Sequence, residues 1–98
     1  MSEAVRVVVK IVTRTDSVAE IRAIVLELAD KSRQEAGCLL YEALENLAEP
    51  ETFVLYEEWE SADHLDAHNR TPHFHHAVAS AAPLLAKPLD VGRYTKIG

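Results

Sequence analysis

The stretch AVRVVVKIVT, residues 4–13, decides the fold class of this chain. Successive residues of an extended strand point to opposite sides, so its side chains divide between two faces. The first face carries Val5, Val7, Val9 and Ile11, and the second carries Arg6, Val8, Lys10 and Val12. This period of two predicts a strand over residues 4–13 with aliphatic side chains on both of its faces.

A helix is predicted next, over residues 17–35. Ser17 followed by Glu20 fits a capping box, in which each side chain accepts a hydrogen bond from a free backbone N–H at the helix start. An apolar stripe follows at helical spacing, formed by Val18, Ile21, Val25, Leu28 and Ala29. Gly37 is expected to end this element in the left-handed conformation that glycine adopts readily.

Two further strands are predicted, from residue 38 to about residue 46 and over residues 53–60. The segment 48–52 between them contains Pro50 and is typical of a turn. Because the separation is short, the two strands are expected to pair as an antiparallel hairpin.

Two helices are predicted after this hairpin. Ser61 is a candidate N-cap for a short helix over residues 62–69. The pair Thr71 and Pro72 starts a second helix, since proline is well tolerated in a first turn, where its missing N–H has no partner to lose. This second helix is expected to run to about Ala82.

Residues 88–97 form the last predicted strand and complete the order β-α-β-β-α-α-β. This order predicts one α+β domain over residues 1–98, with a ferredoxin-like antiparallel sheet that carries its helices on one face. The strands nevertheless have apolar residues on both faces; on the third strand these are Phe53, Leu55 and Trp59 on one side and Val54 and Tyr56 on the other. A bare apolar sheet face is adhesive, and two copies packed sheet to sheet would cover it, so we expect a homodimer.

The composition limits the classes of function. The 98 residues are 48% hydrophobic and carry a formal net charge of −6, and no basic stripe suited to nucleic acid is present. Apolar runs are short and the N-terminus lacks a signal-peptide pattern, so we expect a soluble, cytoplasmic protein with no membrane partner. Cys38 is the single cysteine, and a buried, inert thiol is the favoured interpretation.

All five histidines follow the third predicted strand: His64, His68, His73, His75 and His76. Three interpretations stay open. His64 and His68 share one helix face and suit zinc, but no compact second ligand set accompanies them, so no metal site is predicted. His64, His73 and His75 are typical of solvated helix positions, and His76 is undecided between surface and pocket. His68 shares a face with Leu65, so its imidazole is expected inside, as a pocket base or as a satisfied core residue.

Three runs carry a family resemblance: GCLLYE at residues 37–42, YEEWES at 56–61 and HLDAHNRTPHF at 64–74. With the order of elements, they resemble the antibiotic biosynthesis monooxygenase family, and within it the small quinol monooxygenases. The resemblance implies a dimeric α+β barrel with one pocket per subunit, between the sheet and the later helices. It also implies a monooxygenase that oxidises a small quinol or phenol with molecular oxygen and without a cofactor.

The same resemblance leaves two alternatives open. One is an isomerase of a small carbonyl compound or phosphorylated sugar, and the other is a dimeric ligand-binding or stress-response protein without turnover. The haem-degrading branch fits poorly. Its pocket asparagine on the first strand has no counterpart between Val5 and Thr13, and Val78 stands where that branch has a histidine.

The resemblance places His68 where many members of the family have a pocket histidine. A deprotonated quinol or phenol can pass one electron to triplet oxygen, so a positioned base or anion stabiliser is the role expected of His68. Candidate substrate-binding residues are Tyr56, Trp59, Phe74 and His76, with Arg93 and Tyr94 as weaker candidates. Tyr56 and Trp59 point to opposite faces of their strand, so they cannot both line one cavity.

Overall fold

A computed structural model describes residues 3–98 of the chain. The elements follow in the order β1 (Val5–Val12), α1 (Val18–Ser32), β2 (Cys38–Glu45), β3 (Thr52–Trp59), α2 (Ala62–Asn69), α3 (Pro72–Ala81) and β4 (Asp90–Tyr94), with one 3₁₀ turn (Ala82–Leu84) after α3. The predicted order β-α-β-β-α-α-β is therefore confirmed.

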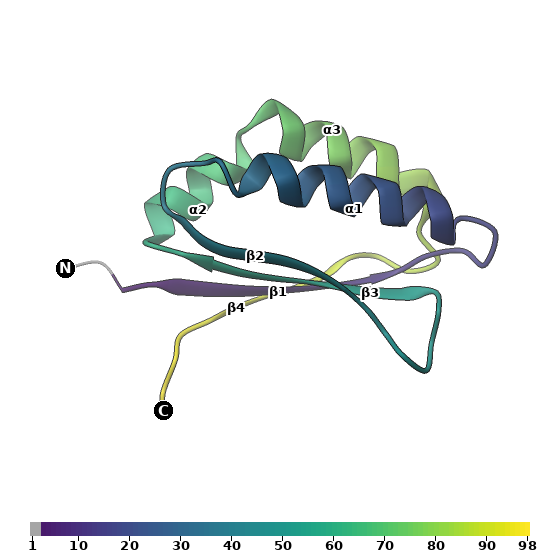
Figure 1. The fold of residues 1–98 in the computed structure, drawn as a ribbon, viewed down its shortest axis with the longest axis horizontal. Coiled ribbons are helices and arrows are strands. Elements are labelled where there is room, and N and C mark those ends of the chain that lie inside the picture. The colour runs from purple at the N-terminus through teal and green to yellow at the C-terminus, as the bar shows by residue number, and fades with distance from the viewer. Residues whose placement is uncertain (1–2) are drawn as a thin grey trace.

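The four strands form one sheet in the order β2-β3-β1-β4, and each neighbouring pair is antiparallel. Among the described residues, the three helices lie on the same face of this sheet, and no helix covers the opposite face (Figure 1). This arrangement confirms the predicted ferredoxin-like α+β fold. It places the last turn of α1, the whole of α2 and the start of α3 together over one end of the sheet (Figure 1).

Helix α1 starts where it was predicted, but the predicted capping box is wrong. The Ser17 side chain caps no backbone N–H; its hydroxyl lies 3.1 Å from Asp16 Oδ1, a carboxylate oxygen to which it donates. An adjacent carboxylate competes locally for the hydroxyl of an N-cap serine, which removes one half of the box. The helix also ends at Ser32 rather than at residue 35.

The starts of α2 and α3 agree with the prediction. Ser61 Oγ accepts a hydrogen bond from the backbone N–H of His64, and Thr71 Oγ1 accepts one from that of Phe74, each at 3.2 Å. The last strand is shorter than predicted. Because β4 pairs with β1 only from Asp90 to Tyr94, the flanking predicted residues have no strand partner to keep them in the sheet.

Gly37 joins α1 and its following turn to α2 by a close approach. Its φ of +81° lies in the left-handed region, and a Cβ built there would stand 2.2 Å from Cγ of His64. No larger residue fits at that distance. The carbonyl oxygen of Gly37 also accepts a hydrogen bond from the N–H of Glu60 at 2.8 Å, so the turn that carries Glu35 is held against β3 and α2.

The core lies between the sheet and the helices. Its most buried side chains are Ile21 and Ala29 of α1 and Trp59 of β3, each fully shielded from solvent. Cys38 packs at the edge of this core and is half-buried rather than buried as expected. Burial and the nearby carboxylate of Glu35 raise the pKa of its thiol, so the thiolate form is disfavoured.

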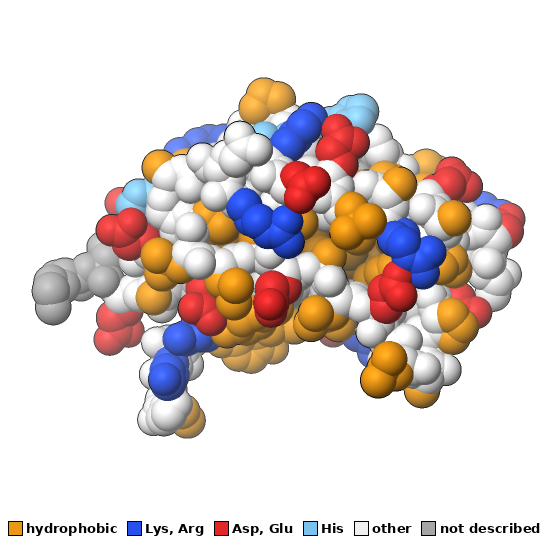
Figure 2. All heavy atoms as spheres, viewed as in Figure 1, with side chains coloured by type: hydrophobic (Ala, Val, Ile, Leu, Met, Phe, Trp, Pro, Cys, Tyr) orange, Lys and Arg blue, Asp and Glu red, His pale blue; other side chains and the backbone are white. Residues whose placement is uncertain are grey.

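The helix-free face of the sheet is the other notable surface. According to the strand register, the apolar and aromatic side chains on this face are those of Val8, Val12, Leu40, Leu44, Val54, Tyr56 and Tyr94. Figure 2 shows hydrophobic side chains gathered along this lower side of the molecule. We call this set of residues the open face. Within residues 3–98, no helix is both long enough and apolar enough to cross a membrane.

Candidate functional site

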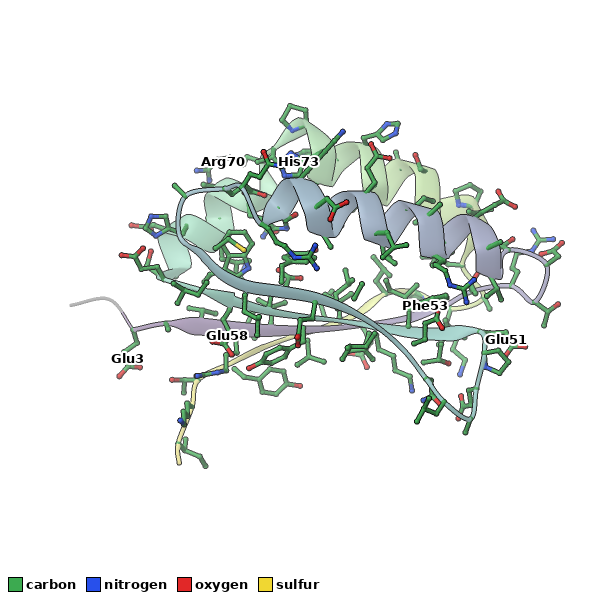
Figure 3. All side chains as sticks on the ribbon, viewed as in Figure 1. Glu3, Glu51, Phe53, Glu58, Arg70 and His73 are labelled. Carbon is green, nitrogen blue, oxygen red and sulfur yellow. The ribbon has the colours of Figure 1, made fainter. Side chains whose placement is uncertain are left out.

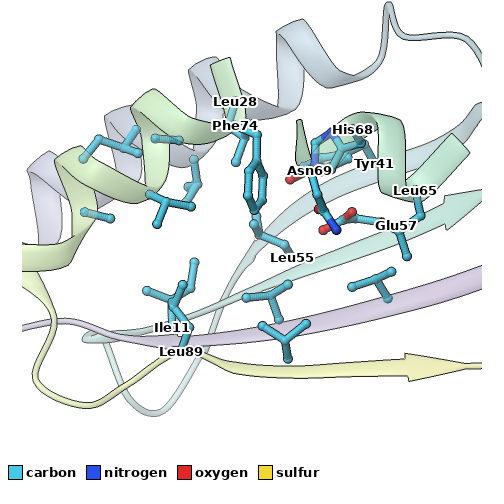
Figure 4. Close-up of a pocket in the computed structure, with 18 of the residues that line it drawn as sticks. Ile11, Leu28, Tyr41, Leu55, Glu57, Leu65, His68, Asn69, Phe74 and Leu89 are labelled. Carbon is cyan, nitrogen blue, oxygen red and sulfur yellow. The ribbon is translucent and has the colours of Figure 1, made fainter. Parts of the chain in front are cut away.

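A cavity of about 170 Å³ lies between the sheet and the three helices (Figure 4). Aliphatic side chains from β1, β3, β4 and the helices form most of its wall, together with Phe74. The polar side chains that line it are Tyr41, Glu57, His68, Asn69 and Arg93. Cavities of about 150 Å³ with apolar walls hold a single benzene ring, so this volume suits one small aromatic ring system.

His68 is positioned at the polar end of this cavity by α2. Leu65, one turn earlier, is buried with it, as the shared helix face predicted. The residue is 1% exposed, and its imidazole lies over the indole of Trp59, with 4.6 Å between the ring centroids. Phe74 of α3 contacts it edge-on from another side, at 5.2 Å between centroids. These packed rings fix the plane of the imidazole.

Glu35 holds the Nδ1 atom of His68. The Glu35 Oε2 atom lies 2.7 Å from His68 Nδ1, so the Nδ1–H group donates to the carboxylate. Nε2 is then the ring nitrogen that carries no proton, and it has no hydrogen-bond partner among residues 3–98. Burial lowers the pKa of His68, and the hydrogen bond and charge of Glu35 oppose this shift. The result is a neutral imidazole with a free acceptor atom.

The same carboxylate oxygen contacts a second histidine. Glu35 Oε2 lies 2.6 Å from Nε2 of His73, which is at the start of α3. His73 is partly exposed, and Figure 3 shows it beside the end of α1. His68, Glu35 and His73 therefore form one continuous set of polar atoms that runs from the cavity to the surface. We call it the histidine–glutamate cluster.

Glu57 is a candidate site residue that the sequence analysis missed. Its side chain is buried, lines the cavity and accepts a hydrogen bond from Nε1 of Trp59 at 2.9 Å. Burial raises the pKa of Glu57 to about 7, against the lowering effect of hydrogen bonds from Trp59 and Tyr41; the charge of Glu35 adds to the rise. A signal was present: Glu57 occupies the inward position between Leu55 and Trp59 in a strand of period two.

Three more polar groups line the cavity with Glu57. Burial raises the pKa of Tyr41, so its phenol stays a neutral donor. Asn69 of α2 points toward Glu57 in Figure 4. Arg93 reaches the cavity from β4, and its guanidinium also lies 3.5 Å from Asp66 Oδ1 on the half-exposed rim. The polar residues of the cavity are thus a neutral base (His68), a carboxyl group with a pKa of about 7 (Glu57), two neutral donors (Tyr41 and Asn69) and one guanidinium (Arg93).

The structure brings only some of the predicted site residues to the cavity. His68 and Phe74 line it, as does the weaker candidate Arg93. Trp59 lies beneath His68 and supports it without lining the cavity.

The remaining candidates lie elsewhere. Tyr56 is on the open face, where its hydroxyl donates to Glu58 Oε2 at 2.8 Å, since strand alternation turns it away from the helices. Tyr94 is on the same face and 56% exposed. His76 is exposed on the outer side of α3 beside Lys31, because α3 turns Ala77, its neighbour, toward the core.

The histidine pair considered for zinc is not assembled. Nδ1 of His64 lies 2.7 Å from Ser61 Oγ, away from the histidine–glutamate cluster. The histidine that shares Glu35 with His68 is instead His73, which the sequence analysis assigned to the surface.

Comparisons with known proteins point in one direction. Residues 4–80 match the profile of the family described as "Antibiotic biosynthesis monooxygenase". The Bacillus subtilis protein named "Putative monooxygenase YcnE" is 41% identical over 66 residues, which are 67% of this chain and 70% of that protein. "Uncharacterized protein sll1783" of Synechocystis is 35% identical over 81 residues, 83% of this chain, but the match spans only 55% of that protein.

A third relative is known from both sequence and structure. "Putative monooxygenase Rv0793" of Mycobacterium tuberculosis is 31% identical over 91 residues, 93% of this chain and 89% of that protein. Its solved structure has a TM-score of 0.93 and 27% identity, covering 98% of this chain and 97% of that one. The likeness therefore extends over the whole fold as well as the matched sequence.

Proposed function

Because this chain belongs to the antibiotic biosynthesis monooxygenase family, we propose that it oxidises a small aromatic quinol or phenol with molecular oxygen and without a cofactor. One observation carries this proposal. A buried histidine, His68, faces an apolar cavity with Nδ1 occupied by Glu35 and Nε2 free to accept a proton. The mostly aliphatic cavity wall supplies apolar surroundings that favour binding of an aromatic ring.

The proposed chemistry starts with proton transfer. A substrate hydroxyl at the polar end of the cavity gives its proton to Nε2 of His68, and Glu35 stabilises the imidazolium that forms. The quinolate or phenolate then passes one electron to oxygen, and the radical pair combines into a peroxide on the ring. This peroxide takes up the proton held by His68 and loses water, so that one oxygen atom stays on the product and the other leaves as water. A positioned general base contributes about 10²–10⁴-fold in rate. Exclusion of water by the apolar wall strengthens the interaction between the substrate anion and the imidazolium.

The lining of the cavity favours an aromatic substrate over a phosphorylated sugar. Arg93 is the single lysine or arginine that lines it within residues 3–98, and its guanidinium also contacts Asp66. A phosphate dianion and several sugar hydroxyls would lose their hydration against aliphatic side chains. An uncharged or singly ionised ring loses far less, so the isomerase alternative ranks second.

Oxygen uptake tests the proposal directly. Chelator-treated, metal-stripped protein is expected to consume oxygen above the autoxidation background with at least one member of a panel of quinols and phenols. An oxygen electrode with a protein-free control measures this. An absence of enzyme-dependent uptake across the panel would overturn the oxygenase proposal. Turnover of a carbonyl compound under anaerobic conditions would then favour the isomerase, and saturable binding without turnover the non-catalytic alternative.

We also propose that two copies pack through the open face. Arg6 and Glu58 lie on this face 3.6 Å apart between its aliphatic side chains, and Figure 3 shows Glu58 on the side away from the helices. Leu44 and Tyr94 are 46% and 56% exposed there. A contiguous apolar face of this kind is unusual on a monomer, and twofold pairing of two sheets removes it from water.

Val8→Glu is expected to convert the dimer to a monomer, weakening association by about 100-fold or more, because each copy would bring a charge to the centre of the apolar contact. Sedimentation velocity over a concentration series measures the effect. Leu26→Glu, at a 52% exposed leucine of α1, is the matched control and is expected to leave the assembly unchanged. A wild-type protein that sediments as a monomer would contradict the pairing proposal.

A further inference from the structure

The histidine–glutamate cluster has the composition of a metal site. Within residues 3–98 it is the one group of three or more histidine, cysteine or acidic residues whose ligand atoms all lie within 4.8 Å of one another. The three residues come from three separate parts of the fold: the turn after α1, the end of α2 and the start of α3. They are Glu35, His68 and His73.

We propose that this cluster binds a divalent transition-metal ion such as zinc, and that the bound ion switches off the base in the cavity. Two imidazoles and one carboxylate are a common ligand set for zinc, which leaves a fourth position for water. Glu35 and His73 have side chains 14% and 20% exposed, so an ion reaches the cluster from solvent while His68 stays buried at 2%. The formal net charge of −6 favours approach of a cation.

Binding of an ion requires the Glu35 carboxylate to move. Zinc bonds of about 2.0–2.2 Å in a tetrahedral arrangement separate neighbouring ligand atoms by about 3.4 Å. Glu35 Oε2 now stands 2.7 and 2.6 Å from the two nitrogen atoms as their shared hydrogen-bond acceptor. Retreat of this carboxylate by about 1 Å, on a side chain that is not fully buried, opens the position for the ion between the three ligand atoms.

The switch follows from the tautomer of His68. In the metal-free protein the proton of the neutral imidazole is on Nδ1, and this N–H donates a hydrogen bond to Glu35. Nε2 is therefore a hydrogen-bond acceptor. A metal ion must take the lone pair of Nδ1, so the single proton of the neutral ring moves to Nε2. Nε2 then becomes a donor and can no longer remove a proton from a substrate. This second half of the inference rests on the proposed function; metal binding does not.

Calorimetric titration of metal-stripped protein with zinc chloride tests the binding, with the absorption spectrum of the cobalt(II) form as a second readout of ligand geometry. The wild-type protein is expected to bind one zinc ion per chain. His73→Gln keeps a hydrogen-bond donor for Glu35 and is expected to weaken binding by at least about tenfold, as loss of a ligand requires. His75→Gln, on the same helix and exposed, is the matched control and is expected to bind as the wild type does.

Absence of stoichiometric binding, or equal affinity in wild type and His73→Gln, would overturn the site. These titrations use no substrate, so they decide the site even if no quinol is oxidised. Where oxygen uptake is found, zinc is expected to lower the wild-type rate below its own zinc-free rate. The same zinc concentrations are expected to leave the rate of His73→Gln equal to the zinc-free rate of that variant. Equal inhibition of both proteins would overturn the switch.

Discussion

His68→Gln is expected to lower the turnover number for oxygen uptake by about 10²–10⁴-fold, the contribution of a positioned general base. The glutamine side chain retains a polar group beside Glu35 and Trp59 but offers no basic nitrogen to the cavity. The effect should fall mainly on kcat, because the apolar wall that binds the ring is unchanged. Steady-state oxygen-electrode kinetics on metal-stripped protein measure kcat and KM separately.

Loss of the fold must be separated from loss of the base. His68 is almost fully buried, so thermal unfolding of His68→Gln is measured beside the wild type, and its cavity is probed by binding of the oxidised product. His75→Gln is the matched control and is expected to keep wild-type turnover. Unchanged kcat in a folded His68→Gln protein would remove His68 from the proposed mechanism.

The wild-type protein is expected to lose folding stability as the pH rises. Glu57→Gln is expected to abolish this loss. Burial raises the pKa of this carboxyl group from 4.5 to about 7. Below about pH 4.5 the group is protonated in both states. Between pH 4.5 and 7 the folded state retains a proton that the unfolded state releases, so the free energy of unfolding falls with rising pH. Above about pH 7 the full penalty, about 3 kcal/mol, applies.

Urea unfolding at fixed protein concentration between pH 4.5 and 8.5 measures this difference. The free energy of unfolding of Glu57→Gln, relative to wild type, is expected to rise by about 3 kcal/mol across that range. Tyr41 of β2 and Glu35 of the turn after α1 act on the pKa of Glu57, and His68 of α2 and Arg93 of β4 line the same cavity. All four groups stay in both proteins. Glu42→Gln, at an exposed carboxyl group of β2, is the matched control. A pH-independent difference for Glu57→Gln would contradict the shifted pKa.

Much of the fold could be predicted because its signals are local. The alternation within residues 4–13 sets side-chain direction from one residue to the next, and Val7, Val9 and Ile11 are indeed buried while Arg6 and Lys10 are not. The N-cap Ser61 was recognised because a cap bonds an N–H only three residues away, and the start of α3 was recognised from the proline in its first turn. Ser17 failed as a cap for an equally local reason, its carboxylate neighbour.

Part of the candidate site was also within reach of the sequence. Helical spacing placed His68 inside with Leu65, and the resemblance to a known family marked it as a pocket residue. Glu57 could have been found in the same way, because it is a charged residue at an inward strand position, but it was not predicted. Tyr56 and His76 were only candidates for the pocket, since no register or helix rotation supported them, and the structure turns both away from it.

The sequence alone determined which side chains point inward, because strand and helix periods depend only on neighbouring residues. Only the tertiary structure decided what those side chains meet. Glu35 is 33 and 38 residues from its two histidine partners, and its place depends on the turn at Gly37 packing against α2. The shifted pKa values of Glu57 and His68 have the same origin, since desolvation arises only when distant segments close over a group and exclude water.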